Sequence, residues 1–400
     1  MTISTYVRHA ALLLGVASLL CARVKTGLDV LVEQDFAPLA GKRVGVIANQ
    51  NTRTWDHHSI VSVMAKSGRF KLTAIFTPEH GFSGQGQAGE AMASGKDAET
   101  GVPIYSLYNH GSYRPTPEML AKVDVLVYDL QDVGARFYTY PATLAYVMQA
   151  AAPAHVSVYV LDRPNPINGV TVEGPVLDPK YTSMIGYGQR PFRHGMTIGE
   201  LAQFFNGEKK IGADLHVIKM EGWDRRMWMD QTGLEWINPS PNLRSLTAVI
   251  LYPGTCLVEN MVVSIGRGTD TPFQMFGAPW MKGLEVADYL NGRAIPGVRF
   301  MARRFTASEV PYKGQECSGV EVELINRNEL NTSRLGLELL AALLRFHPDK
   351  FTLDKKIMLL LGSDKAAQLL KEGKTGAQVD EALAGETEAF RKIREKYLLY

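Results

Sequence analysis

The stretch that decides the fold is Val123–Asp132, with the sequence VDVLVYDLQD. Its apolar residues follow one another almost without interruption and then give way to two carboxylates and an amide. Continuous rather than alternating hydrophobicity is typical of a strand that is buried on both faces of a parallel sheet. The polar residues that follow are therefore expected at the carboxyl edge of that sheet.

Similar apolar runs lie on both sides of this stretch, and plausible helices lie between them. Strands alternating with helices predict a Rossmann-like, doubly wound α/β domain with a parallel sheet. The Pro-, Asn- and Gly-rich segment Arg163–Gly174 predicts a domain boundary, giving a first domain at 25–167 and a second at 168–400. The expected strands are Arg43–Ala48, Leu72–Phe76, Val102–Leu107, Val156–Leu161, Leu215–Lys219, Ala248–Leu251 and Val320–Ile325, and the expected helices are Asp56–Lys66, Thr116–Lys122, Pro141–Ala152, Ile198–Asn206 (with a capping box of Thr197 and Glu200), Leu335–Phe346 and Glu386–Leu399.

Composition excludes several classes of function. The 400 residues are 46% hydrophobic and 21% charged, which is typical of a globular protein. With 43 Lys and Arg against 41 Asp and Glu, no broad basic surface for nucleic acid is expected. The three cysteines include no CxxC pair, and neither HExxH nor G-x-S-x-G occurs, so no metal site and no serine-nucleophile elbow is predicted.

The first 22 residues are predicted to be a signal peptide. Arg8 precedes the short apolar run Ala10–Leu20, an arrangement typical of a secretory leader and too short to span a bilayer comfortably. We therefore expect export to the periplasm or the medium, with no transmembrane span in the mature protein. Cys21 raises the alternative of a lipoprotein, which the bulky Leu20 before it disfavours. The pairing of Cys256 and Cys317 stays open at this stage.

Polar residues follow four of the predicted strands. Asn49 follows the strand Arg43–Ala48, and Glu79 and His80 follow Leu72–Phe76. Asp132 follows the expected strand Val123–Asp129, and Asn165 follows Val156–Leu161. In an open α/β sheet these positions share the carboxyl edge, where ligands bind. The sequence therefore predicts a site on this edge.

The segment Gly84–Gly89 matches G-x-G-x-x-G but lacks the context of a dinucleotide fingerprint. That fingerprint joins a strand directly to a helix, whereas Gly84 lies well past the strand and a poor helix former follows. We predict a glycine-rich loop over the edge of the sheet, and no nucleotide cofactor.

Carboxylates are the remaining candidates for catalysis. Glu79, at the end of a strand, suits a general acid whose environment is fixed and partly desolvated. Glycoside hydrolysis requires a second carboxylate, for which Glu90 and Asp132 are the candidates. Aromatic faces pack on sugar rings and Arg binds carboxylates bidentately. The candidate substrate-binding residues are accordingly Asn49, His80, Arg136, Tyr138, Tyr140, Asn165 and Arg267.

Taken together, six segments resemble the bacterial exo-β-N-acetylmuramidases, a family long known only as a domain of unknown function. The resemblance covers nearly the whole chain after the leader. Its motifs are TPEHGF (Thr77–Phe82), DLQDVGARFYTY (Asp129–Tyr140), DRPNP (Asp162–Pro166), PSPNL (Pro239–Leu243), YPGTCLVE (Tyr252–Glu259) and GRGTDTPFQMFGAPW (Gly266–Trp280).

This resemblance implies a Rossmann-like domain, a smaller α/β C-terminal domain and an active-site cleft between them. It implies an exported hydrolase, without metal or nucleotide, that releases terminal β-1,4-linked N-acetylmuramic acid (MurNAc) from the non-reducing ends of peptidoglycan glycans or muropeptides. The family's catalytic glutamate corresponds to Glu79, and a second glutamate to Glu90.

One segment departs from the family pattern. Gly-Thr-Asn usually follows the glutamate at position 259, whereas Asn260, Met261 and Val262 follow it here. A non-catalytic muropeptide-binding protein using the same cleft is therefore the alternative. A nucleotide-using Rossmann enzyme is a third hypothesis, which the missing fingerprint disfavours.

Overall fold

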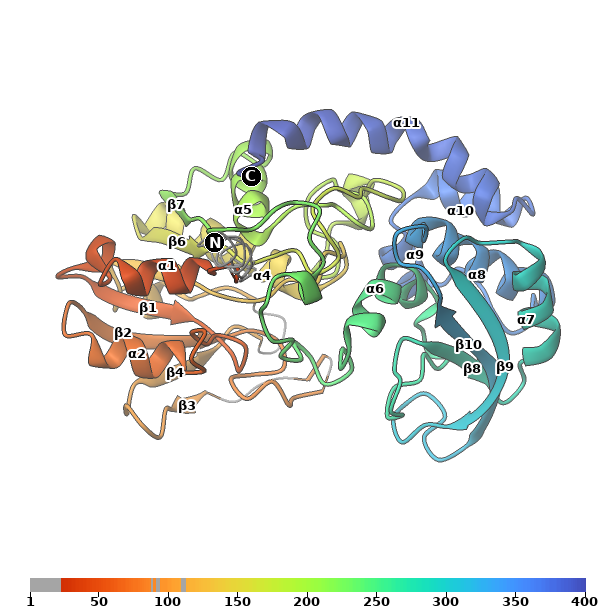
Figure 1. Ribbon diagram of the computed structural model, residues 1–400, viewed down its shortest axis with the longest axis horizontal. Coiled ribbons are helices and arrows are strands. Elements are labelled where there is room, and N and C mark those ends of the chain that lie inside the picture. Colours follow the sequence, from red (N-terminus) through yellow and green to blue (C-terminus); the bar gives the residue numbers. More distant parts are fainter. Residues whose placement is uncertain (1–22, 88, 91–93, 109–112) are drawn as a thin grey trace, which may run out of the picture.

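A seven-stranded sheet forms the core of the N-terminal part of the chain (Figure 1). The computed structural model describes residues 23–87, 89–90, 94–108 and 113–400. The strands lie in the order β3-β4-β2-β1-β5-β6-β7, and all neighbours run parallel except β3 and β4. They span Arg43–Ile47 (β1), Lys71–Thr77 (β2), Gly95–Lys96 (β3), Pro103–Ser106 (β4), Val125–Tyr128 (β5), Ser157–Leu161 (β6) and Leu215–Ile218 (β7).

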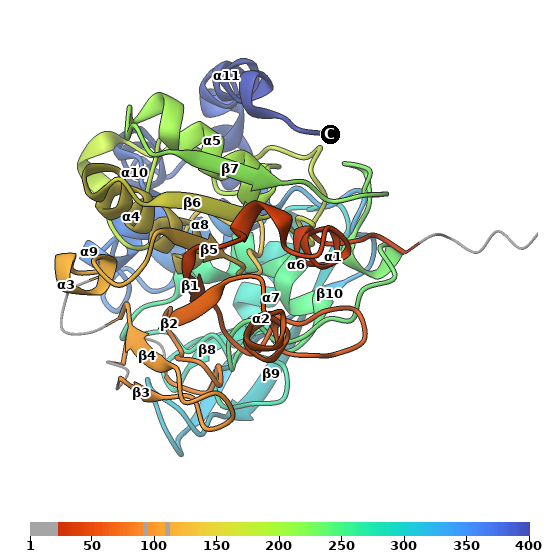
Figure 2. The ribbon, with the colours of Figure 1, turned by 90° about the vertical axis from the view of Figure 1, so that its left-hand side faces the viewer.

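Helices cover both faces of this sheet (Figure 2). On β5, Val125 and Val127 pack into the cluster that includes α1 and α2. Leu126 and Tyr128 pack into the cluster on the opposite face, with α4 and α5. Both sets of side chains are buried, which explains the uninterrupted apolar run of this strand. The four helices span Gly27–Glu33 (α1), Ile60–Lys66 (α2), Thr139–Ala151 (α4) and Ile198–Glu208 (α5).

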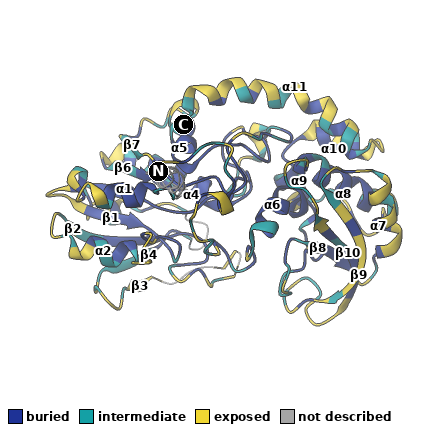
Figure 3. Cartoon of the chain, viewed as in Figure 1, coloured by how far each residue is buried: buried dark blue, intermediate teal, exposed yellow. Residues whose placement is uncertain are grey.

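A second, antiparallel sheet of three strands in the order β8-β10-β9 organises the C-terminal part. Its outer strand β9 is largely exposed, as Figure 3 shows. The fold is thus the predicted combination of a doubly wound sheet and a smaller α/β unit. These elements are β8 (Met275–Ala278), β9 (Val298–Thr306), β10 (Glu316–Leu324), α6 (Leu246–Thr255), α7 (Gly283–Gly292), α8 (Thr332–Phe346), α9 (Lys355–Leu361) and α10 (Asp364–Lys371), and the N-terminal part adds α3 (Pro117–Leu120).

Two sequence predictions need correction. The first sheet continues past residue 167, where we expected the domain boundary, because β7 pairs in parallel with β6. The expected strand Ala248–Leu251 lies within helix α6, which Ser245 caps by accepting a hydrogen bond from the backbone N–H of Ala248. A short apolar run that is buried all round does not distinguish strand from helix.

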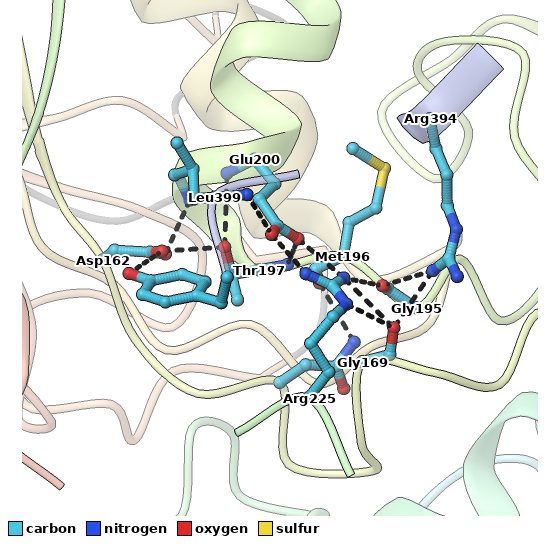
Figure 4. A network of polar contacts seen from close by, with 12 residues as sticks. Asp162, Gly169, Gly195, Met196, Thr197, Glu200, Arg225, Arg394 and Leu399 are labelled. Carbon is cyan, nitrogen blue, oxygen red and sulfur yellow. Dashed lines mark hydrogen bonds and ion pairs between the residues drawn. The ribbon is translucent and has the colours of Figure 1, made fainter. Parts of the chain in front are cut away.

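Helix α11 (Gly376–Arg394) returns the chain from the C-terminal part to the N-terminal sheet (Figure 1). The residues after it enter a buried polar network (Figure 4). The N–H of Leu399 donates to Glu200 and the hydroxyl of Tyr400 donates to Asp162, both at 2.8 Å. Burial, reinforced by Glu200, raises the pKa of Asp162 to about 7. The capping box of Thr197 and Glu200 is confirmed and belongs to this network.

The structure also bears on the cysteines and on membrane insertion. Cys256 and Cys317 are both buried and free. Among the described residues, no helix has the length and apolar character needed to cross a bilayer. The predicted signal peptide, including Cys21, lies outside the described residues.

Candidate active site

Glu79 lies just beyond the end of β2 and is buried, with 6% of its surface exposed. Its Oε1 atom accepts a hydrogen bond of 2.8 Å from the backbone N–H of Gly89. That contact joins the carboxylate to the glycine-rich loop. Burial together with the negative charge of Glu79 raises the pKa of Tyr108, which places this phenol beside the carboxylate.

The adjacent His80 is held by the same loop. Its backbone is left-handed, with φ of 71°, and its Nδ1 atom donates to the carbonyl of Gly86 at 2.7 Å. Burial lowers the pKa of His80, partly offset by Glu79. A neutral imidazole that carries its proton on Nδ1 leaves Nε2 as an acceptor.

The glycine-rich loop thus wraps around the Glu79–His80 pair. Gly84, with φ of 71°, lies so close to the amide of Gln50 that a Cβ atom there would come within 2.0 Å of it. The next element described after the loop is strand β3 rather than a helix. The described part of the loop therefore lacks the arrangement needed for a dinucleotide fingerprint, and its Gly89 N–H binds the Glu79 carboxylate.

Three of the predicted binding residues form one buried group behind Glu79. The rings of Tyr138 and Tyr140 meet edge to face, with centroids 4.7 Å apart. Both hydroxyls donate to the carbonyl of Pro239, at 3.1 and 2.8 Å, and Asn49 donates to the Tyr140 hydroxyl at 3.0 Å. Because these groups are buried and satisfy one another, they position the edge of the sheet beneath Glu79.

Arg267 brings the C-terminal part of the chain to this site. Its positive charge helps to lower the pKa of His80, after the larger effect of burial. It pairs with Glu259 at 3.1 Å and lies over the ring of Phe273. Lys356 also contacts Glu259, at 3.0 Å. Burial opposes ionisation of Glu259, but the two cations outweigh it and lower its pKa to about 2.

The structure places Arg136 away from the predicted site. Its guanidinium is fully buried and donates to the carbonyls of Pro175 (2.9 Å), Arg190 (3.2 Å), Leu360 (2.5 Å) and Leu361 (3.0 Å). These carbonyls leave the side chain no access to a ligand. Arg136 instead joins the N-terminal sheet domain to helix α9.

Asp132 and Asn165 also serve the interior. Asp132 accepts from the N–H of Gly134 at 2.9 Å and lies 3.4 Å from the buried His194. Asn165 donates to the carbonyl of Met196 at 3.0 Å and accepts from a backbone N–H. Both side chains are 3% exposed or less, so they shape the loops of the edge rather than line it.

Glu90 is the candidate second carboxylate that remains near Glu79. It is exposed, and its carboxylate accepts from the N–H of Gln87 at 3.0 Å. Its neighbour Gly89 contacts Glu79 directly.

Sequence reasoning missed the contributions of Tyr108 and Lys356. Tyr108 follows β4, which borders β2, so its place at the same edge was available as a signal. Lys356 lies in α9, far along the chain, and no local pattern marks it. Within the part of the chain that the structure describes, no three His, Cys, Asp or Glu side chains gather in a way that would hold a metal ion.

Comparison with known proteins decides the family. Residues 44–247 match the family model "Exo-beta-N-acetylmuramidase NamZ, N-terminal", and residues 250–400 match the corresponding C-terminal model. The chain belongs to the NamZ family. It is 40% identical over 384 residues to the peptidoglycan β-N-acetylmuramidase NamZ of Bacillus subtilis strain 168, covering 94% of this chain and 92% of that protein.

Solved structures agree with this assignment to NamZ. Two crystal structures of DUF1343 family proteins from Bacteroides fragilis NCTC 9343 superimpose with TM-scores of 0.87 and 0.78. They share 36% and 32% sequence identity with this chain, and each match covers 94% of this chain and 99% of the other. The resemblance inferred from the six motifs and the predicted fold class are both confirmed.

Proposed function

We propose that this chain is an exo-β-N-acetylmuramidase that uses Glu79 as its general acid. It would release terminal β-1,4-linked MurNAc from the non-reducing ends of peptidoglycan fragments. Membership of the NamZ family and the name of the Bacillus subtilis relative support a glycoside hydrolase acting on peptidoglycan. The observation that carries the catalytic assignment is the burial of Glu79 at the end of β2, beneath the loop that binds it.

The surroundings of Glu79 suit proton transfer to a leaving oxygen. One carboxylate oxygen is held by Gly89, which fixes the orientation of the group. A fixed acid avoids the cost of reorientation when the glycosidic oxygen develops charge. Tyr108 and His80 lie near it and add hydrogen-bonding groups to the site.

The cluster of Arg267, Lys356 and Glu259 supports recognition of an acidic sugar. Two cations share one carboxylate, so the cluster keeps one positive charge at neutral pH. MurNAc differs from N-acetylglucosamine (GlcNAc) by a lactyl ether that carries a carboxylate. Arg267, whose charge acts on the neighbour of Glu79, is the residue we assign to that carboxylate.

Glu90 is our candidate for the second catalytic carboxylate. It belongs to the loop that binds Glu79, and it is exposed where a water or a sugar can reach it. The buried Asp132, which is engaged with His194, is the weaker candidate.

The test is the release of free MurNAc from a MurNAc–GlcNAc disaccharide by the wild type and by Glu79→Gln. Glutamine keeps an oxygen for the Gly89 N–H but cannot donate an acidic proton, so the loop should stay in place. We expect the rate to fall by about 10²–10⁴-fold, the usual contribution of a general acid. Binding without release by the wild type would instead support a non-catalytic muropeptide-binding protein. Unchanged release by the variant would refute the role of Glu79.

We also propose that the protein is exported. Peptidoglycan lies outside the cytoplasmic membrane, and Arg8 with the apolar run Ala10–Leu20 has the pattern of a leader. Fractionation of cells that express the full chain, and a variant lacking residues 1–22, tests this. We expect the full chain outside the cytoplasm and the shortened chain inside; equal distributions would refute export.

A further inference from the structure

A cavity of about 400 Å³ lies on the same edge of the large sheet as Glu79. Its walls include Asn51 from the loop after β1, Gln131 from the loop after β5 and Arg163 from the loop after β6. In the strand order of this sheet, β1 has β2 on one side and β5 on the other. The chain therefore leaves β1 toward β2 and later returns to the opposite side of β1 to form β5, so the order of the strands reverses between β1 and β5. Such a switch point is where open α/β sheets bind ligands, and the volume is in the usual range for ligand pockets.

The lining of this cavity has the chemistry of a sugar site. Trp55, which is 65% exposed, and the partly buried Trp236 supply aromatic rings. Aromatic faces pack against the C–H faces of sugars. Asn51 is 3% exposed and donates to the carbonyl of Ile237 at 2.9 Å, but its Oδ1 atom is buried with no hydrogen-bond partner in the structure. A buried acceptor of this kind favours a ligand that brings a hydroxyl or amide N–H.

The charges around the cavity favour a neutral ligand. Arg163 is paired with the buried Asp129 at 2.9 Å and Arg23 lies 3.6 Å from Asp29. Arg53, which also lines the cavity, donates to the backbone carbonyls of Gln50 (3.0 Å) and His57 (3.3 Å). The positive charges of these three arginines are matched by the negative charges of Asp29, Asp129 and Glu235, so the charges around the cavity do not favour a phosphate or another strong anion. The cavity differs in this respect from the cluster of Arg267, Lys356 and Glu259, where the positive charge exceeds the negative charge.

A shared wall places this cavity next to the Glu79 site. Asn51 binds the carbonyl of Ile237, Gln50 binds that of Asn238, and Tyr140, with Asn49 on its hydroxyl, binds that of Pro239. Three successive residues after β1 are thus tied to three successive carbonyls. The cavity lies on the Asn51 side of this wall, and Glu79 lies on the Tyr140 side.

We propose that this cavity binds a neutral N-acetylhexosamine of the glycan, remote from the bond that is cleaved. The class of ligand rests on the proposed function, because a peptidoglycan hydrolase meets neutral GlcNAc units in every substrate chain. Occupation of the cavity would hold a long glycan by more than its terminal sugar. Short substrates would be hydrolysed without using it.

The test measures binding and hydrolysis separately. Binding of the β-1,4-linked GlcNAc trimer is measured by calorimetry in the Glu79→Gln background, with and without Trp55→Ala. We expect the loss of the Trp55 ring to weaken trimer binding by about three- to tenfold, and Trp55→Phe to restore most of it. Leu284→Ala, at a side chain that is also 65% exposed but lies on α7, is the matched control and should leave binding unchanged.

Hydrolysis gives the second readout in the otherwise wild-type enzyme. Trp55→Ala should lower kcat/KM for a long MurNAc-terminated glycan by a similar factor and leave kcat/KM for the disaccharide unchanged. Absent trimer binding, binding insensitive to Trp55, or binding of a nucleotide in place of the trimer would overturn the inference. If no substrate is hydrolysed, the proposed function fails, while trimer binding that depends on Trp55 would still support a saccharide site.

Discussion

Replacing Arg136 tests whether this arginine reads the substrate, as sequence reasoning predicted, or holds the two parts of the chain together. Its four carbonyl partners include Leu360 and Leu361 at the C-terminal end of α9, where a cation also favours the helix dipole. Arg136→Met fills much of the space but removes every donor. Each buried carbonyl left without a donor costs about 1–3 kcal/mol.

The substitution also removes the unfavourable free energy of burying the guanidinium charge, and this gain offsets part of the loss. Burial, with a contribution from Arg190, already lowers the pKa of Arg136. The carbonyl of Arg190 keeps the N–H of Leu177 as a donor, so the loss falls on the other three carbonyls. At about 1–3 kcal/mol for each of these, less the offset, we expect the free energy of unfolding to fall by about 3–5 kcal/mol. Arg136→Lys should lose nearly as much, because one ammonium group does not match the fork of a guanidinium.

The assay combines urea unfolding with the ratio of kcat/KM for matched MurNAc and GlcNAc glycosides. Folded Arg136→Met protein should discriminate between the two sugars as well as the wild type does. The reasoning is refuted if the variant unfolds within about 1 kcal/mol of the wild type. It is also refuted if stability is kept and the preference for MurNAc disappears.

Three further outcomes are expected. Burial raises the pKa of Asp162 from its ordinary 3.8 to about 7, so the stability it contributes is present below about pH 4 and lost as the pH rises through about 7. At about 1.4 kcal/mol per pKa unit, this loss amounts to up to about 4 kcal/mol between pH 4 and 8. The free energy of unfolding of Asp162→Asn, measured by thermal or urea unfolding, should fall by that much less than the wild type's over this range; identical pH profiles would contradict this. Arg267→Met should reduce kcat/KM for MurNAc glycosides by about 10- to 100-fold while changing that for GlcNAc glycosides little; an equal loss on both sugars would remove Arg267 as the reader of the lactyl carboxylate. Gly84→Ala, where φ is 71° and the new Cβ would meet Gln50, should displace the loop over Glu79 and lower kcat by up to about 10²-fold, with a melting temperature close to that of the wild type; unchanged kcat would show that the loop position does not matter.

The sequence predicted the sheet and the position of Glu79 at its carboxyl edge, because both have local signals. An uninterrupted apolar strand such as Val125–Tyr128 is buried on both faces wherever it lies in a parallel sheet. A polar motif that directly follows a strand, such as Glu79 and His80 after β2, then falls on the carboxyl edge by topology alone.

The environment of each side chain had no such signal. Arg136 and Tyr138 both follow β5 in one polar and aromatic run, and nothing in that run shows that Arg136 turns inward to meet carbonyls of α9, more than 200 residues later. Lys356 reaches Glu259 across a shorter but still long separation of 97 residues in the sequence. Long-range partners decide whether a polar residue of a loop faces a ligand or the interior.

The path of α11 has a consequence for biosynthesis. Asp162 and Glu200 belong to the sheet domain, yet their partners Tyr400 and Leu399 are 238 and 199 residues further along the chain. A nascent chain that has completed β7 still lacks these two partners while the whole C-terminal unit is made. The sheet domain is therefore discontinuous, and its closing segment is synthesised only after the C-terminal unit that the segment crosses.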